Sequence, residues 1–117
     1  YDDAAGVTAE FNRNILRHLN RELGANFDPT AFAHRAVWNA HQSRMEMHLE
    51  SRIPQTVSIP SLDLQAHFTA GETIHTENSY KYRPGQPESL LGSAGFSPVH
   101  TWTDERGWFS VCLARAA

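Results

Sequence analysis

The sequence predicts an α+β fold, and two patterns support this. The first part of the chain carries one amphipathic helical pattern, with apolar residues at spacings of three and four. From about residue 44 the pattern changes to short alternating or β-rich runs separated by Pro and Gly, as in antiparallel strands. With 117 residues, 40% of them hydrophobic, the chain can form one packed core and is not disordered by composition.

A single long helix is expected over Ala9–Leu23, with Thr8 as its capping residue and Gly24 as its stop signal. Its apolar positions are Phe11, Ile15, Leu16, Leu19 and Leu23. The polar positions, which we place mostly on the solvent side, are Asn12, Arg13, Arg17, Asn20 and Arg21.

Strands are expected through most of the remaining chain. Strict alternation from residue 44 to 50 places Met45, Met47 and Leu49 on one side and Glu46, His48 and Glu50 on the other. The other expected elements are a helical turn at 28–32, strands at 56–59, 62–68 and 72–82, a helix at 88–94, and a closing β-hairpin of 96–102 and 108–113.

Composition excludes several classes of function. The net charge is −3 and there is no run of Lys or Arg, so no nucleic-acid partner is expected. No stretch approaches the roughly 20 apolar residues of a membrane span, and no signal peptide is recognisable, so we expect no membrane association and a soluble, cytoplasmic protein.

The single Cys112 is interpreted as a small packing residue. Because the chain starts at Tyr1, we expect it to be cut from a longer protein.

Seven histidines raise the question of a metal site. His34, His41 and His48 recur every seven positions, but the alternation around His48 takes it out of a helical register. There is no HExxH motif and no Cys/His cluster, so no metal is expected. Neither GxGxxG nor GxSxG occurs, so the main binding loop of any nucleotide cofactor must lie elsewhere.

The run from Thr76 to Tyr82 is the most informative polar segment. Strand alternation places His75, Glu77 and Ser79 on one side, with successive members about 6.6 Å apart. A carboxylate and a hydroxyl at this spacing can hold a small polar ring between them. The alternative is a solvent-facing strand with a weak surface ion pair that Lys81 makes to Glu77 or Glu72.

Four segments resemble one family. They are YDDAAGVTAEFNRNIL at 1–16, the strand with Met45-Glu46-Met47, TENSYKY at 76–82 and AGFSPVHTWTDERGWFSVCLAR at 94–115. Together they resemble the L-histidine Nα-methyltransferases of ergothioneine biosynthesis, over nearly all 117 residues and about the last third of such an enzyme. The resemblance implies trimethylation of the α-amine of histidine to hercynine, with S-adenosylmethionine as the methyl donor.

The resemblance also implies an architecture. Residues 1–83 would form the substrate-binding α+β region, and residues 84–117 the closing helix and antiparallel hairpin of a class I, Rossmann-like methyltransferase sheet. Four residues would then belong to the core of that sheet: Trp102, Phe109, Val111 and Leu113. The donor-binding loop would lie outside this chain, so the 117 residues alone should be inactive.

The resemblance assigns substrate-binding roles residue by residue. Glu77 and Ser79 match the pair that holds the imidazole, with Asn78 between them, and Tyr1 matches a tyrosine that holds the amino-acid part. Met47 matches a residue that lines the ring pocket, although plain core packing explains it equally well. None of the five is expected to be catalytic. Since Tyr1 is terminal, its backbone is expected to fray.

The expected partners are L-histidine, its methylated forms and the rest of the methyltransferase domain. Two alternatives stay open. One is a non-catalytic module that binds a small ligand or a partner. The other is a chain that self-associates by exchanging strands, because the closing hairpin exposes an edge.

Overall fold

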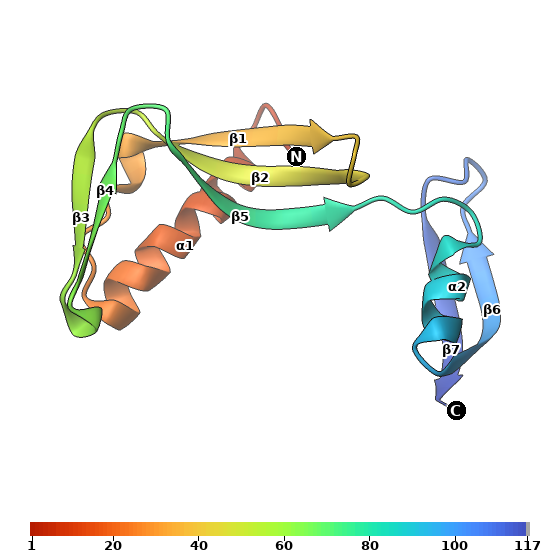
Figure 1. Cartoon of the computed structure of the whole chain (residues 1–117). Helices are drawn as coiled ribbons and strands as arrows, with labels where there is room; N and C mark the ends of the chain where they lie inside the picture. The colour runs from red at the N-terminus through yellow and green to blue at the C-terminus, as the bar shows by residue number, and fades with distance from the viewer. Residues whose placement is uncertain (117) are drawn as a thin grey trace. The chain divides into compact units, whose positions relative to one another are not determined.

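One helix and five antiparallel strands build the first part of the chain, and one helix with a two-stranded hairpin builds the second (Figure 1). The computed structural model describes residues 1–116, which divide into one unit of Tyr1–Tyr80 and another from Lys81 onward. The α+β class predicted from the sequence is confirmed. Within residues 1–116, no helix has the length and apolar character that crossing a membrane requires.

The first helix, α1 (Val7–Leu23), begins two residues earlier than predicted. The predicted cap, Thr8, is wrong: the Asp3 carboxylate accepts hydrogen bonds from the backbone N–H groups of Val7 (3.1 Å) and Thr8 (3.0 Å). This carboxylate satisfies N–H groups that the first helical turn leaves unpaired. These bonds also lower the pKa of Asp3, the one from Thr8 most strongly. Gly24 ends the helix at φ 64°, as expected.

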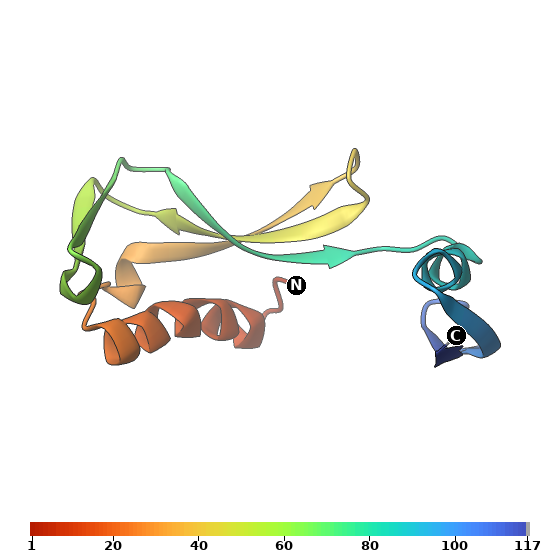
Figure 2. The same ribbon diagram turned by 60° about the horizontal axis from the view of Figure 1, so that its bottom comes forward.

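A three-stranded antiparallel sheet in the order β1-β2-β5 carries the first unit. Its strands are β1 (Phe32–Asn39), β2 (Arg44–Ser51) and β5 (Thr73–Tyr80). The alternation predicted for β2 is confirmed, because Met47 and Leu49 are buried while their neighbours are less so. The sequence did not predict β1. Helix α1 lies along one face of this sheet (Figure 2), and we call that face the inner face and the opposite one the outer face.

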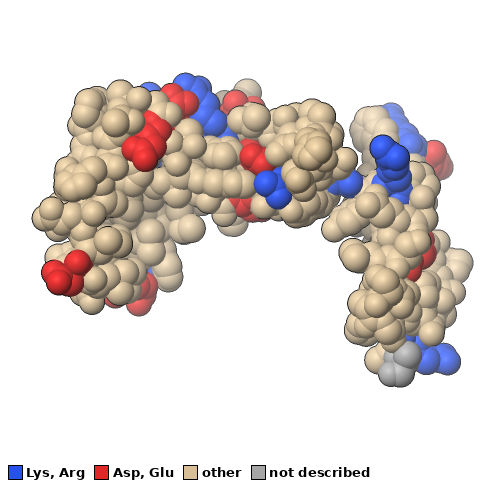
Figure 3. Space-filling view, in the orientation of Figure 1, with Lys and Arg blue, Asp and Glu red and all other residues tan. Residues whose placement is uncertain are grey.

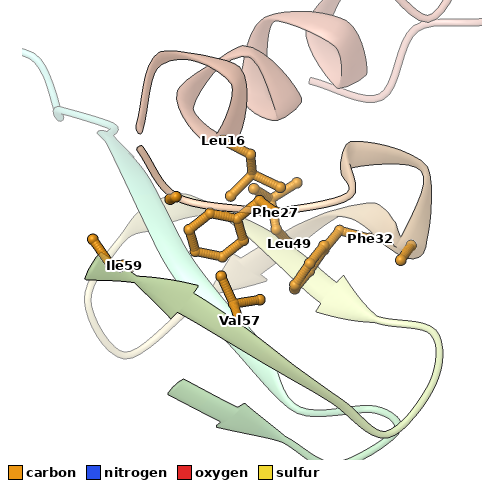
Figure 4. Close-up of a cluster of buried hydrophobic side chains, with 8 residues drawn as sticks. Leu16, Phe27, Phe32, Leu49, Val57 and Ile59 are labelled. Atoms are coloured by element: carbon orange, nitrogen blue, oxygen red, sulfur yellow. The ribbon is translucent and has the colours of Figure 1, made fainter. Parts of the chain in front are cut away.

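The core lies where α1, the sheet and a second hairpin meet (Figure 4). That hairpin is β3 (Gln55–Ile59) with β4 (Leu64–Phe68), joined through a 3-10 turn at Pro60–Leu62. Phe32 is fully buried and packs edge-on against two other Phe rings, with centroids 5.9 and 5.5 Å away. Burying a side chain of this size stabilises the fold by about 1.5 to 3 kcal/mol.

The second unit has helix α2 (Gln86–Ser93) packed on the antiparallel hairpin of β6 (Phe96–Thr103) and β7 (Ser110–Ala116). Thr101 bonds both Glu88 of α2 (2.6 Å) and Cys112 of β7 (3.3 Å), so these groups lie on the helix side. Cys112 is half-buried, in line with a packing role. The residues expected in a sheet core are 50 to 69% exposed here: Trp102, Phe109, Val111 and Leu113.

Acidic and basic side chains are interspersed on the face of the molecule that Figure 3 shows, without a continuous basic surface. In the first unit they form ion pairs such as Arg35 with Glu50 (2.8 Å) and Arg17 with Glu10 (3.0 Å). Exposed pairs of this kind contribute little to stability.

Candidate functional site

An irregularity between β2 and β5 decides which polar side chains share a face. Met47 is opposite Glu77 and His48 is opposite His75, so Thr76 is an extra residue in β5. Residues directly opposite each other in an antiparallel pair point to the same side of the sheet, and Met47 and His48 point to opposite sides. His75 and Glu77 are therefore on different faces, and the strict alternation predicted for this strand is wrong at the bulge.

The bulge brings four of the predicted substrate residues to the inner face. Met47, Glu77 and Ser79 share this face by register, and the Tyr1 hydroxyl lies 2.9 Å from Oγ of Ser79. Met47 is 3% exposed, whereas Glu77 is exposed and Ser79 is half-buried. The inner face thus combines an apolar floor with a carboxylate and two hydroxyl groups at its surface.

A buried polar network anchors Tyr1. The Tyr1 carbonyl oxygen lies 2.7 Å from Nε2 of His34 and can only accept, so Nε2 carries the proton. Nδ1 of the same ring then accepts from the Asn12 amide at 2.9 Å. Asn12 in turn accepts from the Thr76 hydroxyl (2.7 Å), at the bulge itself. The Tyr1 backbone, which we expect to fray as a chain end, is thus hydrogen-bonded to a buried imidazole.

Asn78 lies on the outer face, apart from the other four predicted residues. It is paired in register with Glu46, and its Oδ1 accepts a hydrogen bond from Nε2 of His75 at 2.6 Å. The same face carries Arg44, which donates to the Tyr80 hydroxyl (2.6 Å) and to Glu46 (3.0 Å).

Glu46 is the most strongly perturbed acid among the described residues. The Asn39 amide, together with Arg44 and His48, lowers its pKa from 4.5 to about 2. Its carboxylate is therefore ionised throughout the physiological range. This is a fixed negative charge on the outer face, held by three donors.

The second unit contains a hollow of about 280 Å³, lined only by residues between Tyr82 and Ser110. Glu88 borders it; one of its carboxylate oxygens accepts from Thr101, which lowers its pKa, and the other is buried without a hydrogen-bond partner among residues 1–116. The hollow includes none of the five residues that the sequence singles out, so we assign no substrate to it.

Comparison with known proteins identifies the family. A family model described as histidine-specific methyltransferase, SAM-dependent, matches residues 1–116. The chain belongs to this family. It is 51% identical over 114 residues to the histidine N-alpha-methyltransferase of Mycolicibacterium smegmatis and 48% identical to that of Mycobacterium tuberculosis. Each alignment covers 97% of this chain and 36% of the relative, so the chain spans about a third of the length of these relatives.

Sequence reasoning missed two groups in this histidine-specific methyltransferase chain. Asn12 and His34 are 6% and 7% exposed, and their network positions Tyr1. The sequence did carry a signal for Asn12, because it lies four residues before Leu16 and therefore on the same side of α1. Both residues are buried, whereas Phe11, one of the apolar positions, is 71% exposed. No local signal identified His34, because its strand was not predicted.

Proposed function

We propose that the complete protein carrying this chain transfers methyl groups from S-adenosylmethionine to the α-amine of histidine, giving the trimethylated product hercynine. Residues 1–80 would supply the recognition of the imidazole. Membership of the histidine-specific family supports the reaction. The single observation that carries the site is the bulge at Thr76, because it puts Glu77 and Ser79 on the same face as Met47 and Tyr1.

Each inner-face residue has a role in this proposal. Glu77 accepts the N–H of one imidazole nitrogen, and the Ser79 hydroxyl bonds the other nitrogen. Tyr1 bonds Ser79 and contacts the amino-acid part of the substrate, while Met47 forms the apolar wall under the ring. Asn78 is left out of this site because its side chain bonds His75 on the other face.

Imidazole recognition of this kind selects among amino acids. A site that hydrogen-bonds both ring nitrogens leaves its polar groups unpaired when a substrate lacks them, and such a mismatch is strongly penalised. The mono- and dimethylated intermediates keep the same ring. They would therefore bind through the same contacts, as repeated methylation of one amine requires.

The protein contributes position rather than acid-base chemistry. S-adenosylmethionine, when bound, supplies an electrophilic methyl group on a sulfonium. With the donor bound, the lone pair of the neutral α-amine would form the new C–N bond as the C–S bond broke and the thioether departed, and the first two transfers would each release one N–H proton to solvent. Glu77 and Ser79 hold the imidazole so that the amine is aligned for this in-line attack. None of the segments described in residues 1–116 is a glycine-rich loop, so no residue here is assigned to the methyl donor.

For the second unit, we propose that α2, β6 and β7 complete a Rossmann-like methyltransferase sheet, with a division of the chain near residue 83. The support is an apolar hairpin face. Trp102 and Val111 are opposite each other, Leu113 follows two residues on, and each is at least half exposed within this chain. The remainder of the methyltransferase domain would cover this face.

The test is histidine binding by the complete protein, measured by calorimetry. Glu77→Ala should weaken binding by about 1.5 to 3 kcal/mol, the range for a hydrogen bond to a charged group. The matched control is Asn78→Ala, the next residue on the strand but on the opposite face, which should bind histidine as wild type does. Unchanged affinity in Glu77→Ala, or an equal loss in both variants, would refute the assignment.

A methylation assay addresses the reaction itself. The complete protein should methylate histidine far better than tryptophan or tyrosine. Comparable rates on the three amino acids would show that the imidazole contacts do not select the substrate. A protein that binds histidine but never methylates it would instead be a binding module.

A further inference from the structure

The outer face of the sheet carries a cluster that the methyltransferase reaction does not use. It consists of Glu46, His48 and His75, each of which offers one ligand atom within 4.8 Å of the others. We propose that this cluster binds a divalent first-row transition-metal ion such as Zn²⁺. Two imidazoles and one carboxylate are the protein ligands of several known zinc sites, which leave a further position open.

Two of the ligand atoms already have the spacing of a coordination shell. Oε1 of Glu46 lies 3.2 Å from Nε2 of His48. In a tetrahedral shell, metal–ligand bonds of about 2.0 to 2.2 Å place neighbouring ligand atoms about 3.3 to 3.6 Å apart, close to this distance. An ion can therefore replace the proton that Nε2 now shares with this carboxylate. The ring stays neutral if the displaced proton moves to Nδ1, which is buried and has no hydrogen-bond partner among the described residues.

His75 has a nitrogen available for the same ion. Its ring stacks on His48 with centroids 4.5 Å apart and an angle of 22° between the planes. Nε2 donates to the amide oxygen of Asn78, so Nδ1 is the unprotonated nitrogen of a neutral ring. Metal-binding histidines commonly give their second N–H to an oxygen in this way. In this stacked arrangement the in-plane lone pairs of the two rings do not converge on one point, so the His75 ring must turn out of the stack to direct Nδ1 at the ion, and its exposure allows this.

The surroundings hold Glu46 ready as a ligand. Asn39 and Arg44 both donate to Oε2, whereas Oε1 bonds His48. These two groups orient the carboxylate as outer-shell partners do. The positive charge of Arg44 disfavours a cation nearby. The three ligands together nevertheless carry a charge of −1, because Glu46 is ionised and both imidazoles are neutral.

The test uses the complete protein without a polyhistidine tag, in buffer without free histidine, which would itself chelate the metal. Titration with ZnCl₂ against a chelating dye should show one ion per chain at this site. His75→Ala should weaken that binding at least about tenfold, and Asn78→Ala should weaken it by about ten- to a hundredfold through loss of the outer-shell bond. His41→Ala, in the exposed turn between β1 and β2, is the control and should bind as wild type does.

A second measurement keeps the proposal falsifiable if one variant misfolds. Co²⁺ bound at the site should give visible absorption bands that shift or vanish in His75→Gln. Equal zinc binding by wild type and His75→Ala, or no binding by wild type, would overturn the proposal. Histidine binding should stay unchanged in His75→Ala, since the imidazole site lies on the other face, so failure of one proposal does not imply failure of the other.

Discussion

The two faces of the β1-β2-β5 sheet differ in how their polar groups are held. On the inner face, a buried network of Asn12, His34 and Thr76 fixes the backbone of Tyr1 and sets the hydroxyl pair it forms with Ser79. On the outer face, the contacts join side chains to one another, from the exposed pair of His75 and Asn78 to the half-buried carboxylate of Glu46.

The bulge at Thr76 separates these two sets of polar groups. If Thr76 were paired as an ordinary strand residue, the alternation of β5 would place Glu77 on the same side of the sheet as His75. Because Thr76 bulges, the carboxylate faces Met47 and the imidazole faces His48. Bulges commonly re-aim side chains next to functional sites, and here the bulge places neighbouring polar residues on different faces of the sheet.

Inserting one Ala between Met47 and His48 tests this comparison most severely. The new residue gives Thr76 a partner on β2 and restores strict alternation, so Glu77 and Ser79 would move to the outer face while His75 stays there. Histidine binding by the complete protein should then fall at least about 100-fold, roughly 2.7 kcal/mol. Thr76→Ala, which keeps the bulge but loses the hydroxyl, is the control and should cost much less. Wild-type affinity in the insertion variant, measured by calorimetry, would show that the bulge does not set the site.

Asn12→Ala probes the inner network alone. The substitution leaves Nδ1 of His34 and the His48 carbonyl oxygen without the Asn12 amide, and the Thr76 hydroxyl keeps only the Met47 carbonyl, which should destabilise the first unit by about 3 kcal/mol. Hydrogen exchange of the β2 and β5 amides would measure this loss. Asn14→Ala, on the exposed side of the same helix, should stay within about 0.5 kcal/mol of wild type. Equal protection in the two variants would contradict a structural role for Asn12.

Much of the fold follows from local patterns. The spacing of apolar residues predicted α1 because a helix repeats every 3.6 residues, and the Met45-Met47-Leu49 alternation predicted β2. Strand β1 was missed because Phe32–Asn39 shows three buried residues in succession rather than alternation. It is a strand because it pairs with β2 over its whole length, and that pairing is not visible in its own residues.

The candidate site was predictable only in part, for a related reason. The i, i+2 spacing correctly predicted that Glu77 and Ser79 share one face, because both residues lie after the bulge, where the strand alternates regularly. The bulge itself depends on how β5 pairs with β2, which lies about 25 to 35 residues earlier in the chain. Asn12 was placed in solvent because it is polar; its burial depends on His34 and Thr76, which reach it from two different strands.

Tyr1→Phe tests the hydroxyl pair at the edge of the inner face. The ring and its backbone anchor to His34 remain, and the 2.9 Å contact with Ser79 is lost. Histidine affinity should fall by about 1 kcal/mol, roughly fivefold. Tyr80→Phe removes a comparable hydroxyl from the outer face, where it bonds Arg44, and should leave histidine affinity unchanged. Equal effects of the two substitutions would mean that the faces are not functionally distinct.

The smallest expected effect concerns the outer-face charge. The pKa of Glu46 is about 2 in the folded protein and near 4.5 when unfolded, so its interactions stabilise the fold fully above pH 4.5. This contribution should disappear as the pH falls from 4.5 to 2, because protonation then occurs in both states. Carbon-13 NMR of the Glu46 carboxyl should show a midpoint near pH 2, and Asn39→Ala should raise it, since the Asn39 amide is the largest cause of the shift. A midpoint near 4.5 in wild type would show that Glu46 is not held by these donors, and would remove the orienting contacts on which the metal site depends.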